Sequence, residues 1–267
     1  MASFKNHKSN YHSHTWLCRH AKGDVIDYLK EAIKHGFHTL GVSDHAPYKV
    51  LYERGSLRMS EDEFYNTYLQ MFDNANSLAK EHNIKIYKGL EIEYIPNNND
   101  FYLKLLKDLD YLILGQHYII INGKFKSSFG LSTIEEVKIY SDMVVEALKT
   151  NHFKMLAHPE LCFYNILNPT KEMFELLRPV IKTCKELNIP LEINANGIRK
   201  VGKKQSNNYH LYPYPVPYFW QMVKEEGASA IITSDAHLPE ELNDWAVEKA
   251  YEFANHFKIK LINDLDI

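Results

Sequence analysis

Histidines and carboxylates recur in short clusters along this chain, and both are residue types that bind divalent metal ions. The chain has 14 histidines among 267 residues. The clusters are His12-Ser13-His14, Asp44-His45, Gly89-Leu90-Glu91, Gly115-Gln116-His117, His158 and Asp235-Ala236-His237. Alternate residues of a strand point to one face, so His12 and His14 could reach one ion, as could Asp235 and His237. Imidazole and carboxylate ligands that do not require a thiolate favour Zn, Fe or Mn.

Each cluster lies at the carboxyl end of a predicted strand. Apolar, β-branched runs predict seven strands, at about 10–12, 38–45, 84–95, 111–121, 153–158, 189–194 and 229–237. Amphipathic stretches predict helices between them, at about 24–36, 60–82, 133–149, 171–187 and 217–226, with a short helix between the strands 84–95 and 111–121 and a last helix at about 242–256. Asp24 is a predicted N-cap, Ser60 with Glu63 a capping box, and Asn122-Gly123 a hairpin turn.

Seven strand-then-helix units without a linker predict one α/β domain over residues 1–267, with parallel strands in a closed or nearly closed barrel. A doubly wound open sheet is the alternative topology. In both cases the carboxyl ends of the strands line the ligand site. The clusters therefore predict a multinuclear metal site at one rim, suited to phosphoryl or acyl hydrolysis.

Composition narrows the function classes. Lys plus Arg number 31 against 34 for Asp plus Glu, a net charge of −3, which gives no general attraction to nucleic acid or anionic membranes. No apolar stretch approaches the roughly 18 residues of a membrane span, and the N-terminus lacks the apolar core of a secretory signal. Three cysteines favour a reducing cytoplasm over a disulfide framework.

The motifs resemble the polymerase and histidinol phosphatase (PHP) superfamily of metal-dependent phosphoesterases, whose fold is a distorted (β/α)7 barrel. The segments HSHTWLCRHA, SDHAP, GLEIEYIP, LAHPE, INANGIRK and SDAH, between His12 and His237, are similar to its histidinol-phosphatase branch in particular. The resemblance implies hydrolysis of L-histidinol phosphate to L-histidinol and phosphate, a step of histidine biosynthesis.

The resemblance also implies a ligand set for three divalent ions. His12 and His14 would bind one ion with Glu91 and Asp235. Glu91 would bridge to a second ion held by His117 and His158. The third ion would be held by His20, His45 and His237. A hydroxide bridging two ions would attack phosphorus directly, without a covalent phosphoenzyme.

Other residues are expected to bind substrate or assist the reaction. Arg199, after the sixth strand, is predicted to clamp the phosphate because arginine meets phosphate bidentately, and Arg19 is a second candidate. Lys200, Lys203 and Lys204 add positive charge. Asp44 is a candidate proton donor to the leaving group. Glu160 and Glu93 are candidate partners of the substrate's amine, and Tyr209, Tyr212 and Tyr214 a candidate aromatic wall.

Three other functions remain as alternatives. A related phosphoesterase would act on another small phosphate ester, phosphotyrosine or a nucleic-acid phosphodiester, although a nuclease needs a basic track that this chain lacks. An amidohydrolase also carries His-x-His on its first strand, but it has eight strands and a simpler metal set. A non-catalytic metal-binding protein does not require so many ligands around an open rim. The sequence does not determine the oligomeric state.

Overall fold

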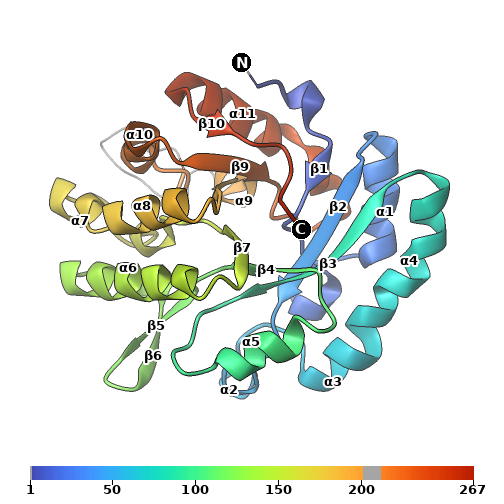
Figure 1. The fold of residues 1–267 in the computed structure, drawn as a ribbon, viewed down its shortest axis with the longest axis horizontal. Helices are drawn as coiled ribbons and strands as arrows, with labels where there is room; N and C mark the ends of the chain where they lie inside the picture. Colours follow the sequence, from blue (N-terminus) through green and yellow to red (C-terminus); the bar gives the residue numbers. More distant parts are fainter. Residues whose placement is uncertain (1, 201–211) are drawn as a thin grey trace.

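The computed structural model describes residues 2–200 and 212–267. Within these ranges, one parallel sheet of eight strands curls into a half-barrel, with helices around its outer face (Figure 1). In sheet order the strands are β1 (Ser9–Asn10), β2 (Thr39–His45), β3 (Lys85–Ile92), β4 (Tyr111–Leu114), β7 (Phe153–Leu156), β8 (Leu191–Asn194), β9 (Ser229–Thr233) and β10 (Lys260–Leu261). The predicted α/β class and distorted (β/α)7 barrel are confirmed, and β10 is an additional short edge strand.

One predicted strand is divided. The run 111–121 was expected as a single strand, but the chain leaves the sheet after Leu114. Its second half is β5 (Tyr118–Ile121), which pairs with β6 (Lys124–Ser127) in an antiparallel hairpin outside the barrel. The predicted turn at Asn122-Gly123 joins them, and φ values of 50° and 72° are those of a primed two-residue hairpin turn.

The helices follow the predicted amphipathic stretches, with some division. They are α1 (Val25–Lys34), α2 (Lys49–Tyr52), α3 (Glu61–Glu63), α4 (Leu69–Glu81), α5 (Asn99–Leu105), α6 (Ile134–Lys149), α7 (Lys171–Glu175), α8 (Arg178–Glu186), α9 (Ala195–Arg199), α10 (Pro217–Glu226) and α11 (Trp245–Phe257). Asp24 caps α1, and Ser60 and Glu63 form the expected capping box.

The expected helix over 60–82 contains one π-helical segment, Phe64–Tyr68, between α3 and α4. This segment directs Tyr68 inward, where its hydroxyl donates toward the carbonyl oxygens of Gly89 at 2.8 Å and Val42 at 3.0 Å. Tyr68 thereby links β2 and β3 close to the ends that carry Asp44 and Glu91.

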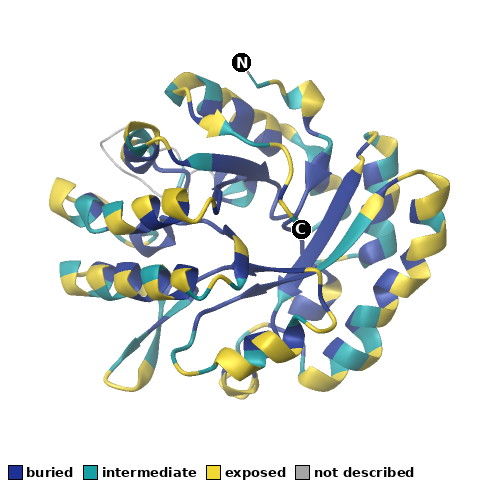
Figure 2. Ribbon diagram, in the orientation of Figure 1, coloured by how far each residue is buried: buried dark blue, intermediate teal, exposed yellow. Residues whose placement is uncertain are grey.

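The first and last parts of the sheet meet beyond their strands. Ser13 and Ala236 form an isolated parallel bridge, and the His14 amide donates to the Ala236 carbonyl at 2.8 Å. This contact brings the His12-His14 cluster beside the Asp235-His237 cluster. Figure 2 shows most of the central strands of the sheet buried and the outer faces of the helices exposed, as expected for a barrel packed beneath helices.

Apolar side chains form a second, smaller core cluster. Leu265, near the C-terminus, packs in it with Tyr11, Tyr111, Met155 and other apolar residues. Among the described residues no helix is long and apolar enough to cross a membrane. The three cysteines are buried and free of disulfides.

Candidate metal centre

The predicted ligands converge at the carboxyl ends of the strands. His12, His14, Glu91, His158 and Asp235 are all buried there. Two of them have a left-handed backbone, with φ of 27° at His158 and 44° at Asp235. Non-glycine residues adopt such angles at a cost of roughly 1 kcal/mol or more, which is typical of functional positions.

The first ligand group consists of His12, His14, Asp235 and one oxygen of Glu91. The Nε2 atoms of His12 and His14 lie 3.2 Å apart, and Asp235 Oδ1 lies 3.1 Å from His14 Nε2. Glu91 Oε2 is 3.6 Å from each of these nitrogens. Within residues 2–200 and 212–267, the buried Asp235 Oδ1 has no hydrogen-bond partner. An ion among these atoms would satisfy that oxygen, so the donor set fits a divalent metal.

The second ligand group uses the other oxygen of Glu91. Glu91 Oε1 lies 2.8 Å from His158 Nε2 and 3.1 Å from His117 Nε2. The Glu91 carboxylate is therefore shared between the two groups. Gly115 allows this position, because a Cβ at residue 115 would come within 2.2 Å of Glu91 Oε1.

His20, His45 and His237 gather on the open side of the cluster. The His20 ring centroid lies 4.7 Å from that of His237 and 5.6 Å from that of His45. The ring nitrogens of these three histidines do not come close enough together in the structure to bind one ion. His45 converges with His14 and Glu91, and His237 with His14 and Cys18. The structure thus places the third expected set beside the other two without bringing its nitrogens to one point.

Hydrogen bonds behind the rings fix their orientation. Three carboxylates accept from ring Nδ1 atoms: Glu192 from His12 at 2.7 Å, Glu93 from His117 at 3.1 Å, and Asp44 from His14 at 3.4 Å. The carbonyl oxygens of Cys18 and Asp235 accept from Nδ1 of His20 and His237. A ring that donates through Nδ1 keeps its Nε2 lone pair for a metal, so five imidazoles are set to ligate through Nε2.

The charges at the centre are strongly coupled. Burial opposes ionisation of Glu91, but His117, His12 and His45 outweigh it and hold the pKa of this carboxyl well below its usual range. Burial likewise opposes protonation of His14, yet Asp235 and Asp44 raise the pKa of His14 to about 9. Without metal the acidic cluster thus holds protons on its imidazoles, and divalent cations would replace them.

The outer imidazoles behave in the opposite way. Burial and the neighbouring His14 lower the pKa of His45 to about 4, and the same two effects lower the pKa of His20 and His237. Neutral imidazole is the metal-binding form, so these three rings are ready to ligate at neutral pH.

Arg199 does not reach the ligand cluster. Its guanidinium binds both carboxylate oxygens of Asp244, at 2.8 and 3.0 Å, and donates to the carbonyl oxygens of Ser234 and Glu241. The short helix α9 directs Arg199 toward α11, so its donors are occupied by protein. Arg19 pairs with Glu63 on the surface. The structure therefore brings neither arginine to the position expected of a phosphate clamp.

The carboxylates expected to contact substrate are also engaged elsewhere. Glu160 accepts from Trp220 Nε1 at 2.7 Å and from the Val216 amide at 2.9 Å. Glu93 binds Arg58 through both oxygens, at 2.8 and 3.1 Å, besides accepting from His117. Neither is placed to meet a substrate amine.

Asp44 is occupied in the same way. One of its oxygens accepts from the Thr15 amide and hydroxyl, and the other faces the His45 amide and His14. The structure shows Asp44 as a support for His14 and does not place it as a proton donor. Of the other expected groups, Lys203, Lys204 and Tyr209 lie outside the described residues.

Several residues of the site were not identified from the sequence. Glu192 is the main one: besides His12, it accepts from the His158 amide at 2.8 Å, from Asn194 and from Thr233. A glutamate inside the otherwise apolar run Ile189–Ile193 was the available signal, because a buried carboxylate needs partners. Arg58 gave no such signal, because its role depends on packing against Glu93.

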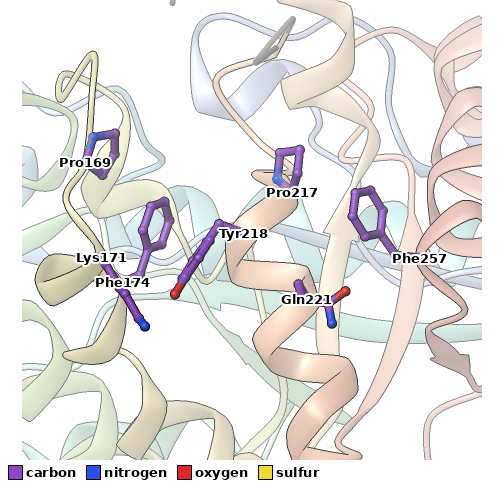
Figure 3. A pocket seen from close by; sticks show the side chains of 7 residues that line it. All are labelled: Pro169, Lys171, Phe174, Pro217, Tyr218, Gln221 and Phe257. Carbon is purple, nitrogen blue, oxygen red and sulfur yellow. The ribbon is translucent and has the colours of Figure 1, made fainter. Parts of the chain in front are cut away.

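A cavity of about 70 Å³ opens on the cluster. Glu91, Asp235 and five of the histidines line it, together with Phe129, Asn196, Lys200 and Tyr214. It adjoins a second pocket of about 290 Å³, with which it shares His20, His45, His117 and Phe129. A larger pocket of about 410 Å³ lies elsewhere, among Pro169, Phe174, Pro217, Tyr218 and Phe257 (Figure 3). It holds none of the ligand residues, so the chemistry is assigned to the first two.

Solved structures with a similar fold include histidinol phosphatases. One is the histidinol phosphate phosphatase of Lactococcus lactis in complex with Zn, L-histidinol and phosphate. Its TM-score is 0.71 at 17% identity, covering 98% of this chain and 99% of that one. Another is the putative histidinol phosphatase of Listeria monocytogenes, with a TM-score of 0.69 at 18% identity over 88% and 97% of the two chains.

Sequence comparison identifies relatives of the same kind. A probable histidinol-phosphatase of Schizosaccharomyces pombe is 24% identical, covering 90% of this chain and 84% of the relative. The histidinol-phosphatase of Bacillus subtilis is 21% identical, covering 86% and 93%. The PHP domain model matches residues 10–196, which is most of the chain. The chain therefore belongs to the PHP domain family.

Proposed function

We propose that the protein is a phosphomonoesterase that uses three divalent ions to hydrolyse L-histidinol phosphate to L-histidinol and phosphate. The observation that carries the proposal is the Glu91 carboxylate shared between two histidine groups, the arrangement needed to hold two ions side by side. The names of the relatives support histidinol phosphate as the substrate, as does the L. lactis complex. Zn, Fe and Mn all suit these ligands.

His12, His14 and Asp235 would hold one ion, His117 and His158 a second, with Glu91 between them. His20, His45 and His237 would hold the third. Bound divalent ions would supply an acidified water molecule and neutralise charge on the phosphate oxygens. The protein itself holds the ligand rings in position. Glu192, Glu93 and Asp44 do this by accepting hydrogen bonds from the ring Nδ1 atoms.

Lys200 is the cation that we propose for phosphate capture in place of Arg199. It lines the cavity, and its ammonium lies 5.6 Å from the centre of the Tyr214 ring. Asn196 lines the same wall and donates toward Asp235 at 3.2 Å. A lysine there would attract the phosphate dianion and offset its charge as the ester oxygen leaves.

The test is phosphate release by metal-reconstituted protein from histidinol phosphate, beside glycerol phosphate, phosphotyrosine and a phosphodiester, with a chelated control. We expect the highest kcat/KM for histidinol phosphate and loss of turnover on chelation. A higher kcat/KM for another ester would overturn the substrate assignment, and turnover unaffected by chelation would overturn the metal dependence. Lys200→Met should raise KM for phosphate esters, whereas the exposed Lys185→Met should not.

A further inference from the structure

The pocket beside the metal cavity has an aromatic wall. Phe129 lines both hollows, and Tyr118 and residues 55–58 complete the second one. A phosphate held at the ligand cluster would place the rest of its ester in this pocket, because the two hollows share Phe129 and three of the histidines. This role of the pocket rests on the proposed function, since it concerns the leaving group of that same reaction.

The Phe129 ring is fixed in place although it is 36% exposed. It lies parallel to the His117 ring with centroids 6.0 Å apart, and the Tyr164 ring meets it edge-on at 5.1 Å. The neighbouring Ser128 amide donates to the His117 carbonyl at 2.7 Å, which ties this turn to a metal ligand. A rigid, partly exposed aromatic ring is a platform on which a planar group can stack.

The charges around the pocket do not favour an ammonium group. Among the described residues that line it, none is an aspartate or glutamate, and Arg58 is one of them. Residues 201–211 contain neither acid in the sequence. Glu93 and Glu160, the two acids expected to bind the amine, are committed to Arg58 and to Trp220. Glu91 and Asp235 in the adjoining cavity are committed to the ligand groups.

We propose that Phe129 determines substrate specificity by stacking on the imidazole ring of the leaving group, and that the site recognises this ring and not the ammonium. The ring of histidinol phosphate is planar and matches the Phe129 face. The amine would point to solvent.

Two substrate analogues distinguish recognition of the imidazole ring from recognition of the amine. The deamino analogue of histidinol phosphate keeps the imidazole, and alaninol phosphate keeps the amine without the ring. We expect kcat/KM for the deamino analogue within about threefold of that for histidinol phosphate. For alaninol phosphate we expect a loss of roughly tenfold to a hundredfold, the range that stacking of a heterocycle on an aromatic side chain provides.

Variants assign the effect to Phe129. Phe129→Leu should raise KM for histidinol phosphate roughly tenfold, with little change in kcat and no change toward alaninol phosphate. Phe129→Trp should retain the preference for the imidazole-bearing substrate, because tryptophan keeps an aromatic face. A loss seen in Phe129→Leu but not in Phe129→Trp is therefore due to stacking and not to a folding defect. Phe125→Leu, on the β5–β6 hairpin that precedes Phe129 and outside the pocket lining, is the matched control and should behave as wild type.

The outcomes distinguish the two proposals. The stacking proposal would be overturned if Phe129→Leu keeps the preference for histidinol phosphate. It would also be overturned if the deamino analogue, which lacks only the amine, loses that preference. Both results would leave the proposed function intact. If the wild-type protein shows no preference for histidinol phosphate over glycerol phosphate, both proposals are overturned.

Discussion

Glu192 accepts a hydrogen bond from His12 Nδ1 at 2.7 Å, and its other oxygen accepts from the His158 amide at 2.8 Å. One buried carboxylate on β8 thus positions a ligand of the first group and the backbone of a ligand of the second. Burial opposes protonation of His12, but Asp235, Glu192 and Glu91 raise the pKa of this ring well above its usual value. Glu192 therefore orients His12 and, together with Asp235 and Glu91, raises its basicity.

Replacing Glu192 should weaken metal binding more than it disturbs the fold. In Glu192→Gln the amide keeps the shape but loses the charge that orients His12, and we expect metal affinity to fall roughly 10- to 100-fold. Competition with a chelating dye measures this change. Glu186→Gln, exposed on α8, is the matched control, and equal affinities for the two variants would contradict this role of Glu192.

Gly115 should be intolerant of even one methyl group. The added Cβ in Gly115→Ala would lie 2.2 Å from Glu91 Oε1 and 2.6 Å from its Cγ, so Glu91 must move. We expect loss of bound metal and at least about a tenfold loss of turnover, because the shared carboxylate no longer reaches both groups. Metal analysis together with circular dichroism checks this. The control is Gly130→Ala, where a Cβ meets no atom within 4 Å, and this variant should retain its metal. Full metal content in Gly115→Ala would contradict the need for a glycine beside Glu91.

Arg199 should contribute to stability and not to phosphate binding. Its pairing with Asp244 is largely buried, and Arg199→Ala should lower the free energy of unfolding by about 2 to 3 kcal/mol, somewhat below the range for fully buried pairs. Urea denaturation measures this loss, and KM for histidinol phosphate should stay near the wild-type value. The control Arg54→Ala, at an exposed site, should cost less than about 1 kcal/mol. A raised KM at unchanged stability would restore Arg199 as the clamp.

His7 should make the fold sensitive to acid. Burial, reinforced by Lys8 and His35, lowers the pKa of His7 to about 3. The unfolded chain takes up this proton below about pH 6.5, so the stability from neutral His7 is lost as pH falls from 6.5 toward 3. Between pH 7 and pH 5 this amounts to about 2 kcal/mol.

Denaturation of wild type and His7→Phe at both pH values isolates this contribution. The variant should lose about 2 kcal/mol less than wild type on acidification, since it has no group to protonate there. His82→Phe, at an exposed position, should lose as much as wild type. The same loss in His7→Phe would show that His7 is not the acid-sensitive group.

Much of the fold followed from local patterns. Strand periodicity, the caps at Asp24 and Ser60 and the Asn122-Gly123 turn all depend on neighbouring residues, and the structure shows each of them. The π-helical segment at Phe64–Tyr68 did not follow, because it depends on Tyr68 reaching the carbonyls of β2 and β3. The exit of the chain from the sheet after Leu114 was not predicted either; Gly115, the next residue, lies against the Glu91 side chain.

The candidate ligands could be proposed from the sequence because strand periodicity and motif order both concern residues close in sequence. The partners of charged groups could not, because they are distant along the chain. Arg199 was expected to bind the phosphate, but its guanidinium binds Asp244, which is 45 residues away in the sequence. Glu93 and Asp44 were expected near substrate, and each instead supports a histidine. Residue type indicates what a side chain can bind, while the tertiary fold decides which partner is in reach.

We propose that divalent ions held on either side of Glu91 make this protein a phosphomonoesterase. The most direct measurement is kcat/KM for histidinol phosphate, with bound metal determined in parallel, for metal-free protein, metal-restored protein and Glu91→Gln. We predict no turnover without metal and recovery when metal is restored. In Glu91→Gln we predict fewer bound ions and at least about a thousandfold loss of kcat/KM, or about 4 kcal/mol of transition-state stabilisation. Full turnover by the metal-free protein, or by Glu91→Gln, would contradict the proposal.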